Sequence, residues 1–424
     1  MNELDFNKLV DDAEYIDPNF GENGEMILSV HFQACYYLWN THTPETRQAI
    51  LNCYHRYMEL WGGHITWGFD PLADWKQKPF NQLPLLIHVM DRFKHPDEAI
   101  EWYVANGGCK GEEVDYVNSY VFFFLTSPEW DIQDGSRLNF RVPRSLYFSE
   151  TSKQQILDFH HYCLEQLKPW YAVAGMQAAT PFSDNNIKID LVRQARDFYH
   201  LYFPTTWDMV RQAYGIRSFD WLTYISHGLA EKIGGHIKLE HALNEAQLNY
   251  KTIGKGVLIQ ATEHPEIVPH NTPIPEGYSK LNRIVRPLRD GNYGSMGDGT
   301  YLGDNLQSFD DRLTDLWMCR FDHERVWNDL ISTMSFTKPK DNIQLTTNQV
   351  CEISGRYRYD DDFDFARNEP MPYDSNDTRE GDHRAYIMLN KGDIAPYYLK
   401  LDQHGNFIEA MEIQWTLFEE FHYF

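Results

Sequence analysis

The residues best suited to metal chemistry are two adjacent histidines and a nearby cysteine, His160, His161 and Cys163. Imidazole nitrogens and thiolates are common zinc ligands, and a structural zinc site needs four of them. The surrounding residues have helical spacing, and adjacent positions on a helix point to different sides of it. No third and fourth ligand at a suitable spacing is present, so we expect no metal site here.

Four aspartates on a glycine-rich stretch form a second group of possible ligands: Asp298, Asp304, Asp310 and Asp311. They lack the D-x-[DN]-x-[DN]-G order of a calcium-binding EF-hand loop. The chain also has no G-x-S-x-G elbow, Walker-type phosphate loop, H-E-x-x-H helix or G-x-G-x-x-G turn after a strand. Carboxylates or histidines brought together only by the fold would escape such a search. The sequence itself predicts no catalytic residue, no metal and no cofactor.

The densest negative charge lies near the C-terminal end of the chain. The candidate binding residues there are Asp360, Asp361, Asp362, Asp364, Asp374, Asp377, Glu380 and Asp382. Two interpretations stay open, because a run of like charges is often a solvated loop and can also be an interaction segment. The whole chain has a net charge of −24. This charge repels nucleic-acid phosphates and would speed association with a basic protein.

Length and composition indicate a folded globular protein. The 424 residues are 42% hydrophobic and 15% aromatic, enough for one large core or two smaller ones. No run approaches the roughly 20 apolar residues of a membrane span, and the N-terminal stretch is acidic without an apolar signal core. The six cysteines stand singly, which is typical of buried thiols in a reducing compartment. We expect a cytoplasmic protein that contacts no membrane.

Hydrophobic spacing predicts a first β-α-β unit. A strand over 26–37 leads to a helix with Thr43 as its N-cap and Pro44 in its first turn. Gly62-Gly63 ends this helix, and a short strand over 64–69 follows.

A second unit repeats this order about a hundred residues later. A strand over 138–148 precedes a helix that Ser152 and Gln155 would open as a capping box, and a strand over 170–178 follows. The identity between the two units is low, so an internal duplication and a chance recurrence of a common order are both open. A duplication would give ferredoxin-like halves that share one sheet.

Further elements follow from the same periodicities. The clearest is a strand over 219–225 that enters a helix capped by Ser226 and ended by Gly234-Gly235. The other expected helices span 96–105, 186–202, 239–246, 276–287 and 310–334, the other strands 117–125, the region of Tyr250 and 256–261, and 75–96 is expected to be a linker.

The composition changes at Ser335, where short strand candidates separated by turns begin. These strands span 350–353, 385–389, 397–401 and 407–418. We therefore predict an α+β domain over 1–335 with a mainly antiparallel sheet, built from β-α-β units with helices packed on it. A small, acidic, β-rich accessory region over 336–424 would follow.

Four stretches in this order resemble the TsiV-type family of type VI secretion immunity proteins. They are HTPETRQAILNCYHRYMELWGGHITWGFDP (42–71), GIRSFDWLTYISHGLAEKIGG (215–235), GKGVLIQATEHPEIVPHNTPIPEGYSKLNRIVRPLR (254–289) and LWMCRFD (316–322). The resemblance covers 26–322, and the tail lies outside it. It implies a cytoplasmic protein of a Gram-negative bacterium that binds and neutralises a toxin delivered by the type VI apparatus. The family supplies no catalytic residues to transfer.

Three classes of function are open, and toxin neutralisation by tight binding is the first. It predicts a toxin encoded next door, and the strong acidity would suit a basic toxin. An adaptor of the secretion machinery would instead show a secretion defect on deletion. A hydrolase that reverses the toxin's effect would lose protection, but not the complex, on substitution of one carboxylate or histidine.

Overall fold

The structure is a computed structural model. It describes residues 29–107, 117–130, 136–179, 215–267, 272–291, 311–322, 334–364, 369–371, 384–402 and 407–423. Its α-helices are α2 (Pro44–Trp61), α3 (Leu86–Arg92), α4 (Arg144–Tyr147), α5 (Glu150–Leu167), α7 (His227–Ala230), α8 (His236–Glu245), α9 (Glu276–Val285) and α10 (Asp311–Met318). No helix in these ranges is long and apolar enough to cross a membrane.

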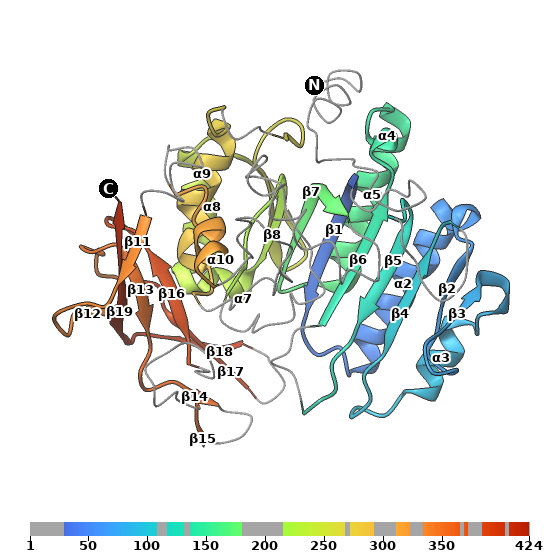
Figure 1. The fold of residues 1–424 in the computed structure, drawn as a ribbon, viewed down its shortest axis with the longest axis horizontal. Helices are drawn as coiled ribbons and strands as arrows, with labels where there is room; N and C mark the ends of the chain where they lie inside the picture. The colour runs from blue at the N-terminus through green and yellow to red at the C-terminus, as the bar shows by residue number, and fades with distance from the viewer. Residues whose placement is uncertain are drawn as a thin grey trace, which may run out of the picture.

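One large sheet forms the centre of the molecule (Figure 1). Its ten strands run in the order β3-β2-β4-β5-β6-β1-β7-β8-β10-β9, and every neighbouring pair is antiparallel. They are β1 (Ser29–Leu38), β2 (Trp67–Asp70), β3 (Lys76–Pro79), β4 (Glu101–Ala105), β5 (Val121–Leu125), β6 (Ser136–Val142), β7 (Tyr171–Ala179), β8 (Leu222–Ser226), β9 (Asn249–Ile253) and β10 (Gly256–Gln260). The predicted α+β class with a mainly antiparallel sheet is confirmed.

Both predicted β-α-β units are present, and they share this sheet. The strand expected over 138–148 is β6, which ends at Val142, and α4 follows it. Strands β7, β1, β6 and β2 keep the order of a ferredoxin-like arrangement, with β5 and β4 inserted between β6 and β2. The two crossover helices, α2 and α5, pack against each other on one face of the sheet. The inserted pair makes the sheet wider than two ferredoxin-like halves require.

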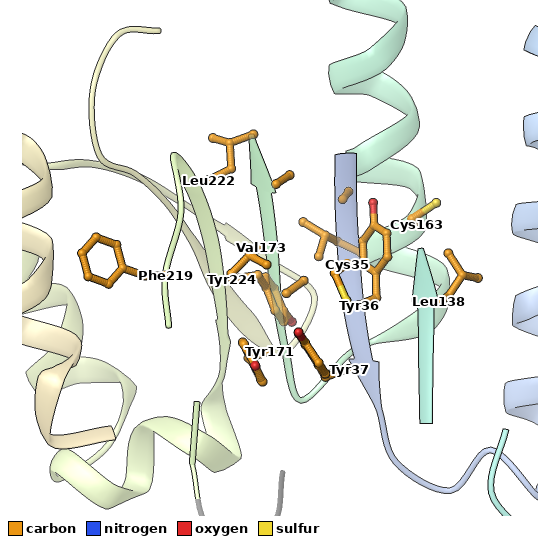
Figure 2. Packing of buried hydrophobic residues seen from close by; sticks show 14 of the residues in the cluster. Cys35, Tyr36, Tyr37, Leu138, Cys163, Tyr171, Val173, Phe219, Leu222 and Tyr224 are labelled. Carbon is orange, nitrogen blue, oxygen red and sulfur yellow. The ribbon is translucent and has the colours of Figure 1, made fainter. Parts of the chain in front are cut away.

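The core between these helices and the sheet is aromatic. Phe140 of β6 meets Phe159 of α5 edge to face with ring centroids 4.8 Å apart, and Trp61 of α2 meets Phe159 at 5.2 Å. Figure 2 shows Tyr37 near the end of β1 beside Tyr171 at the start of β7, and their rings stack with centroids 4.2 Å apart. Pairs of this kind add free energy beyond the area they bury.

Of two helix starts predicted from the sequence, one is confirmed and one is wrong. Thr43 is the N-cap of α2 and accepts a hydrogen bond from the backbone N–H of Thr46 at 3.3 Å, as expected. The predicted capping box at Ser152 is wrong, because α5 already begins at Glu150 after Ser149. Ser152 therefore lies within the first turn of the helix.

The 219–235 stretch folds as predicted. Its strand is β8, and the side chain of Ser226 accepts a hydrogen bond from the backbone N–H of Leu229 at 3.1 Å. Gly234 ends the following turn with a φ of 93°, a left-handed conformation that favours glycine. Trp221 and Leu222 are 2% and 5% exposed, so both belong to the core.

Two expectations between the units are wrong. The helix predicted over 96–105 is strand β4, whose Trp102, Tyr103 and Val104 pair with the phenylalanines of β5. Aromatic and β-branched residues favour this extended pairing over a helix. The predicted linker over 75–96 contains β3 and α3. The helix predicted over 186–202 lies outside the described residues.

The C-terminal region contains a second, five-stranded sheet and two short ribbons. Its strands are β11 (Met334–Thr337), β12 (Gln344–Thr346), β13 (Gly355–Arg358), β14 (Phe363–Asp364), β15 (Glu369–Pro370), β16 (Tyr386–Leu389), β17 (Tyr398–Leu401), β18 (Phe407–Met411) and β19 (Gln414–Tyr423). The strand predicted over 350–353 is wrong, since only an isolated bridge joins Val350 to Ile394. Strand β11 crosses the predicted boundary at residue 335, and that boundary stays a prediction.

Candidate functional site

The first histidine of the pair on α5 packs in the core and belongs to no candidate metal-binding group in the described part of the chain. His160 is buried, and its Nδ1 lies 2.7 Å from the hydroxyl of Tyr36 in β1. Burial, and then the neighbouring His161, lower the pKa of His160 to about 3, so its ring is neutral at pH 7. Cys163 is buried as a free thiol. Within the described ranges no group of three or more histidine, cysteine or acidic side chains could hold a metal ion.

Only one of the four aspartates weighed for calcium lies in the described part of the chain. Asp298, Asp304 and Asp310 lie outside the described residues, and Asp311 is the first residue of α10. Their interpretation rests on the sequence.

The first three acidic candidates of the C-terminal region face different surroundings. Asp360 and Asp361 form an exposed turn after β13, and Asp360 accepts hydrogen bonds from Arg358 at 2.7 Å and from Arg384 at 3.2 Å. Asp362 is 2% exposed and accepts hydrogen bonds from the Tyr398 hydroxyl at 2.5 Å and the backbone N–H of residue 385 at 2.6 Å. The turn exposes Asp360 and Asp361 to solvent, whereas Asp362 is buried and hydrogen-bonded within the C-terminal region.

Of the remaining acidic candidates, the structure describes only Asp364. Asp364 lies in β14, which pairs with β15. The other candidates lie outside the described residues; they are Asp374, Asp377, Glu380 and Asp382. Beside the turn, burial and then the carboxylates of Asp361 and Asp362 raise the pKa of Tyr359. The acidic turn at 360–361 is therefore the part of the predicted binding segment that the described structure shows to be exposed.

A buried ionic network that the sequence did not indicate joins the C-terminal region to the large sheet and the helices around it, called the large domain below. Arg356 of β13 forms ion pairs with Asp315 of α10 and Glu419 of β19, and its Nε donates to the carbonyl of Gly291 at 2.7 Å. Arg286 and Asp393 form another pair across the same boundary. Nothing local in the sequence marks these residues as partners, because they come from distant segments.

Two surface pockets lie beside the large sheet. The first, the junction pocket, has a volume of about 440 Å³ and is lined by residues of the large domain together with Phe407 of β18. The second, the α5 groove, has a volume of about 430 Å³ and lies between α5 and strands β8, β9 and β10. Lys153, His161 and Lys251 stand in the α5 groove with Glu150 and Glu263, so its charge is mixed.

The fold has a counterpart among solved structures. A chain described as the type VI secretion system protein PA0821 of Pseudomonas aeruginosa superimposes with a TM-score of 0.62. The match covers 78% of this chain and 96% of that chain, at 19% sequence identity. At this identity the likeness concerns the fold alone. A search of curated proteins finds no match.

The sequence places the protein in a family of bacterial immunity proteins. The family model TsiV, described as type VI immunity for VRR-NUC, matches residues 49–321. The match spans more than half of the chain, and the chain belongs to this family. The four stretches quoted from the sequence fall in or directly beside the matched range, so the predicted resemblance is confirmed. The family implies that the protein binds a cognate effector toxin.

Proposed function

We propose that the protein protects its cell by binding a VRR-NUC nuclease toxin and blocking the toxin's surface, without a chemical step of its own. The observation that carries this proposal is the family match over residues 49–321. A nuclease needs a basic surface to hold nucleic-acid phosphates. A protein with a net charge of −24 is suited to occupy such a surface.

The acidic turn of the C-terminal region is the part of the described surface that we assign to this contact. Asp360 and Asp361 are exposed, and the two arginines bonded to Asp360 hold its carboxylate in place. The second sheet behind the turn is anchored to the large domain through Arg356 and Asp315. A fixed array of carboxylates loses less conformational freedom on binding than a mobile loop does. The rest of the acidic segment, over 364–382, would extend the same contact.

The site of action in this proposal is the cytoplasm, where the nucleic acid of the cell lies. Protection then depends on the amount of complex formed, and no substitution of a single carboxylate or histidine should abolish protection while the complex remains intact. A substitution that did abolish protection while the complex stayed intact would favour an enzyme that reverses the toxin's effect. A loss of toxin export after deletion, with normal resistance to the toxin, would favour an adaptor of the secretion machinery.

The experiment that tests the electrostatic part measures the association rate of the purified protein with its toxin at increasing ionic strength. We expect the rate to fall steeply between low and physiological salt, because screening shortens the reach of the acidic surface. A rate that does not depend on salt would refute the acidic contact and leave the immunity role untouched. Failure to form any complex would refute the proposal as a whole.

A further inference from the structure

The junction pocket has a basic rim, in contrast to the acidic character of the whole chain. Lys168 and Lys255 are exposed lining residues, and Glu45 is the one carboxylate among the described residues of the lining. Neither lysine has a carboxylate within ion-pair distance in the part of the chain that the structure describes. His227 also lines the pocket, with its ring stacked on that of His236 at 4.2 Å. An anionic group would find two unpaired cations here.

Lys168 has a backbone conformation that is unfavourable for a residue with a β-carbon. It is the C-cap of α5 and has a φ of 47°, in the left-handed region where helices usually place glycine. A β-carbon is strained in this conformation. The chain therefore carries a cationic side chain at the rim where the backbone alone favours glycine.

The interior of the pocket is aromatic. Trp39 and Trp170 meet edge to face with ring centroids 5.9 Å apart, and Phe407 of the C-terminal region also lines the pocket. A β-carbon on Gly228 would lie 2.8 Å from the ring of Trp170, so glycine permits this close approach. Phe407 is 36% exposed, so part of its ring faces solvent.

We propose that the junction pocket binds an extended segment of a partner protein in which an aromatic or aliphatic side chain stands next to a carboxylate. The apolar side chain would pack against Trp39 and Trp170, while the carboxylate would pair with Lys168 and Lys255. The volume of about 440 Å³ lies within the range of ligand pockets, roughly 300–1,000 Å³. A small free carboxylate would leave most of this volume unfilled, which favours a protein segment with two neighbouring side chains. The pocket thus selects acidic chemistry, opposite to that of the proposed toxin contact, and does not depend on it.

The test uses the full chain labelled with fluorotryptophan and observed by fluorine NMR. The resonances of Trp39 and Trp170 are assigned with Trp39→Phe and Trp170→Phe variants. The probe is the capped peptide acetyl-Gly-Phe-Asp-Gly-amide, compared with its Phe-Asn counterpart and with phenylacetate. We expect saturable shifts of both resonances with the Asp peptide, and affinities at least about tenfold weaker for the Asn peptide and for phenylacetate.

The decisive variant is Lys168→Gly, because it separates binding from folding. Glycine relieves the left-handed backbone, so the unfolding midpoint should stay the same or rise, while binding of the Asp peptide should weaken about tenfold. Lys153→Gln in the α5 groove is the matched control and should bind the peptide as the unaltered chain does. Equal binding of the Asp and Asn peptides, or an unchanged affinity of Lys168→Gly, would overturn the proposal. Phenylacetate binding as tightly as the peptide would overturn the assignment to a protein segment.

Discussion

Arg356 of β13 holds its guanidinium 2.6 Å from the carboxylate of Asp315 in α10, and neither side chain is more than 2% exposed. The two residues lie on opposite sides of the predicted domain boundary. Their pairing ties the second sheet to the last helix of the family match. The C-terminal region is thus bonded to the large domain through its interior, and its acidic turn has a fixed place relative to the large sheet.

Removal of this arginine should destabilise the protein strongly. Arg356→Ala leaves the buried carboxylate of Asp315 without its guanidinium, and breaking a buried pair costs about 3–5 kcal/mol in the free energy of unfolding. Denaturant unfolding measures this loss. The control is Lys280→Ala, which removes a surface pair with Glu276 and should change stability little, because solvent screens such pairs. Equal effects of the two variants would contradict the structural role of Arg356.

Trp221 should contribute strongly to the free energy of unfolding, because its large side chain is buried. It lies edge to face against Phe32 and Tyr147, and its Nε1 donates to the carbonyl of Thr262 at 2.8 Å. Trp221→Ala should lower the free energy of unfolding by about 3–5 kcal/mol, because a cavity remains and a hydrogen bond is lost. Thermal or denaturant unfolding checks this value. A loss below about 1 kcal/mol would show that the site collapses around the smaller residue.

Asp220 should make stability depend on pH between about 4 and 6. Burial raises the pKa of this carboxyl from 3.8 to about 6, although Gln177 and the backbone N–H of Trp221 bond to it. Between these two values the folded protein binds more protons than the unfolded chain, so stability falls as pH rises through the window. The change from this group is up to about 3 kcal/mol.

The comparison of the unaltered chain with Asp220→Asn isolates this contribution. Across the window the stability of the variant should rise relative to that of the unaltered chain as pH increases, because asparagine does not titrate. A constant difference from pH 4 to pH 6 would show that Asp220 titrates at the same pH in the folded and unfolded states.

The acidic turn should affect how fast the toxin binds. Asp360→Asn combined with Asp361→Asn removes two exposed charges, and the association rate should drop several-fold at low salt with a weaker salt dependence. Asp74→Asn combined with Asp91→Asn removes the same charge from the far end of the large sheet, near β3 and α3. If both double variants slow association equally, net charge and not the turn controls the rate.

Local sequence rules predicted several elements whose signals lie within a few residues, although the capping box at Ser152 is not formed. The cap at Thr43, the stop at Gly234 and the entry of β8 into its helix each depend on neighbours in the chain, and each was found. The prediction of a helix over 96–105 is wrong, because pairing with the later strand β5 determines the conformation of this segment. Helical spacing over so short a stretch does not outweigh the hydrogen bonds and packing of a sheet.

The sequence by itself determined the fold class, the family and the surplus of negative charge, because these depend on residue order and composition alone. Only the tertiary structure decided that Asp362 turns inward while Asp360 and Asp361 stay in solvent, and that Arg356 meets Asp315. The junction pocket likewise exists because Trp39, Lys168, Lys255 and Phe407 converge from distant segments. Such contacts depend on how the strands are ordered in the sheet, and that order is set by packing across the whole chain rather than by any local pattern.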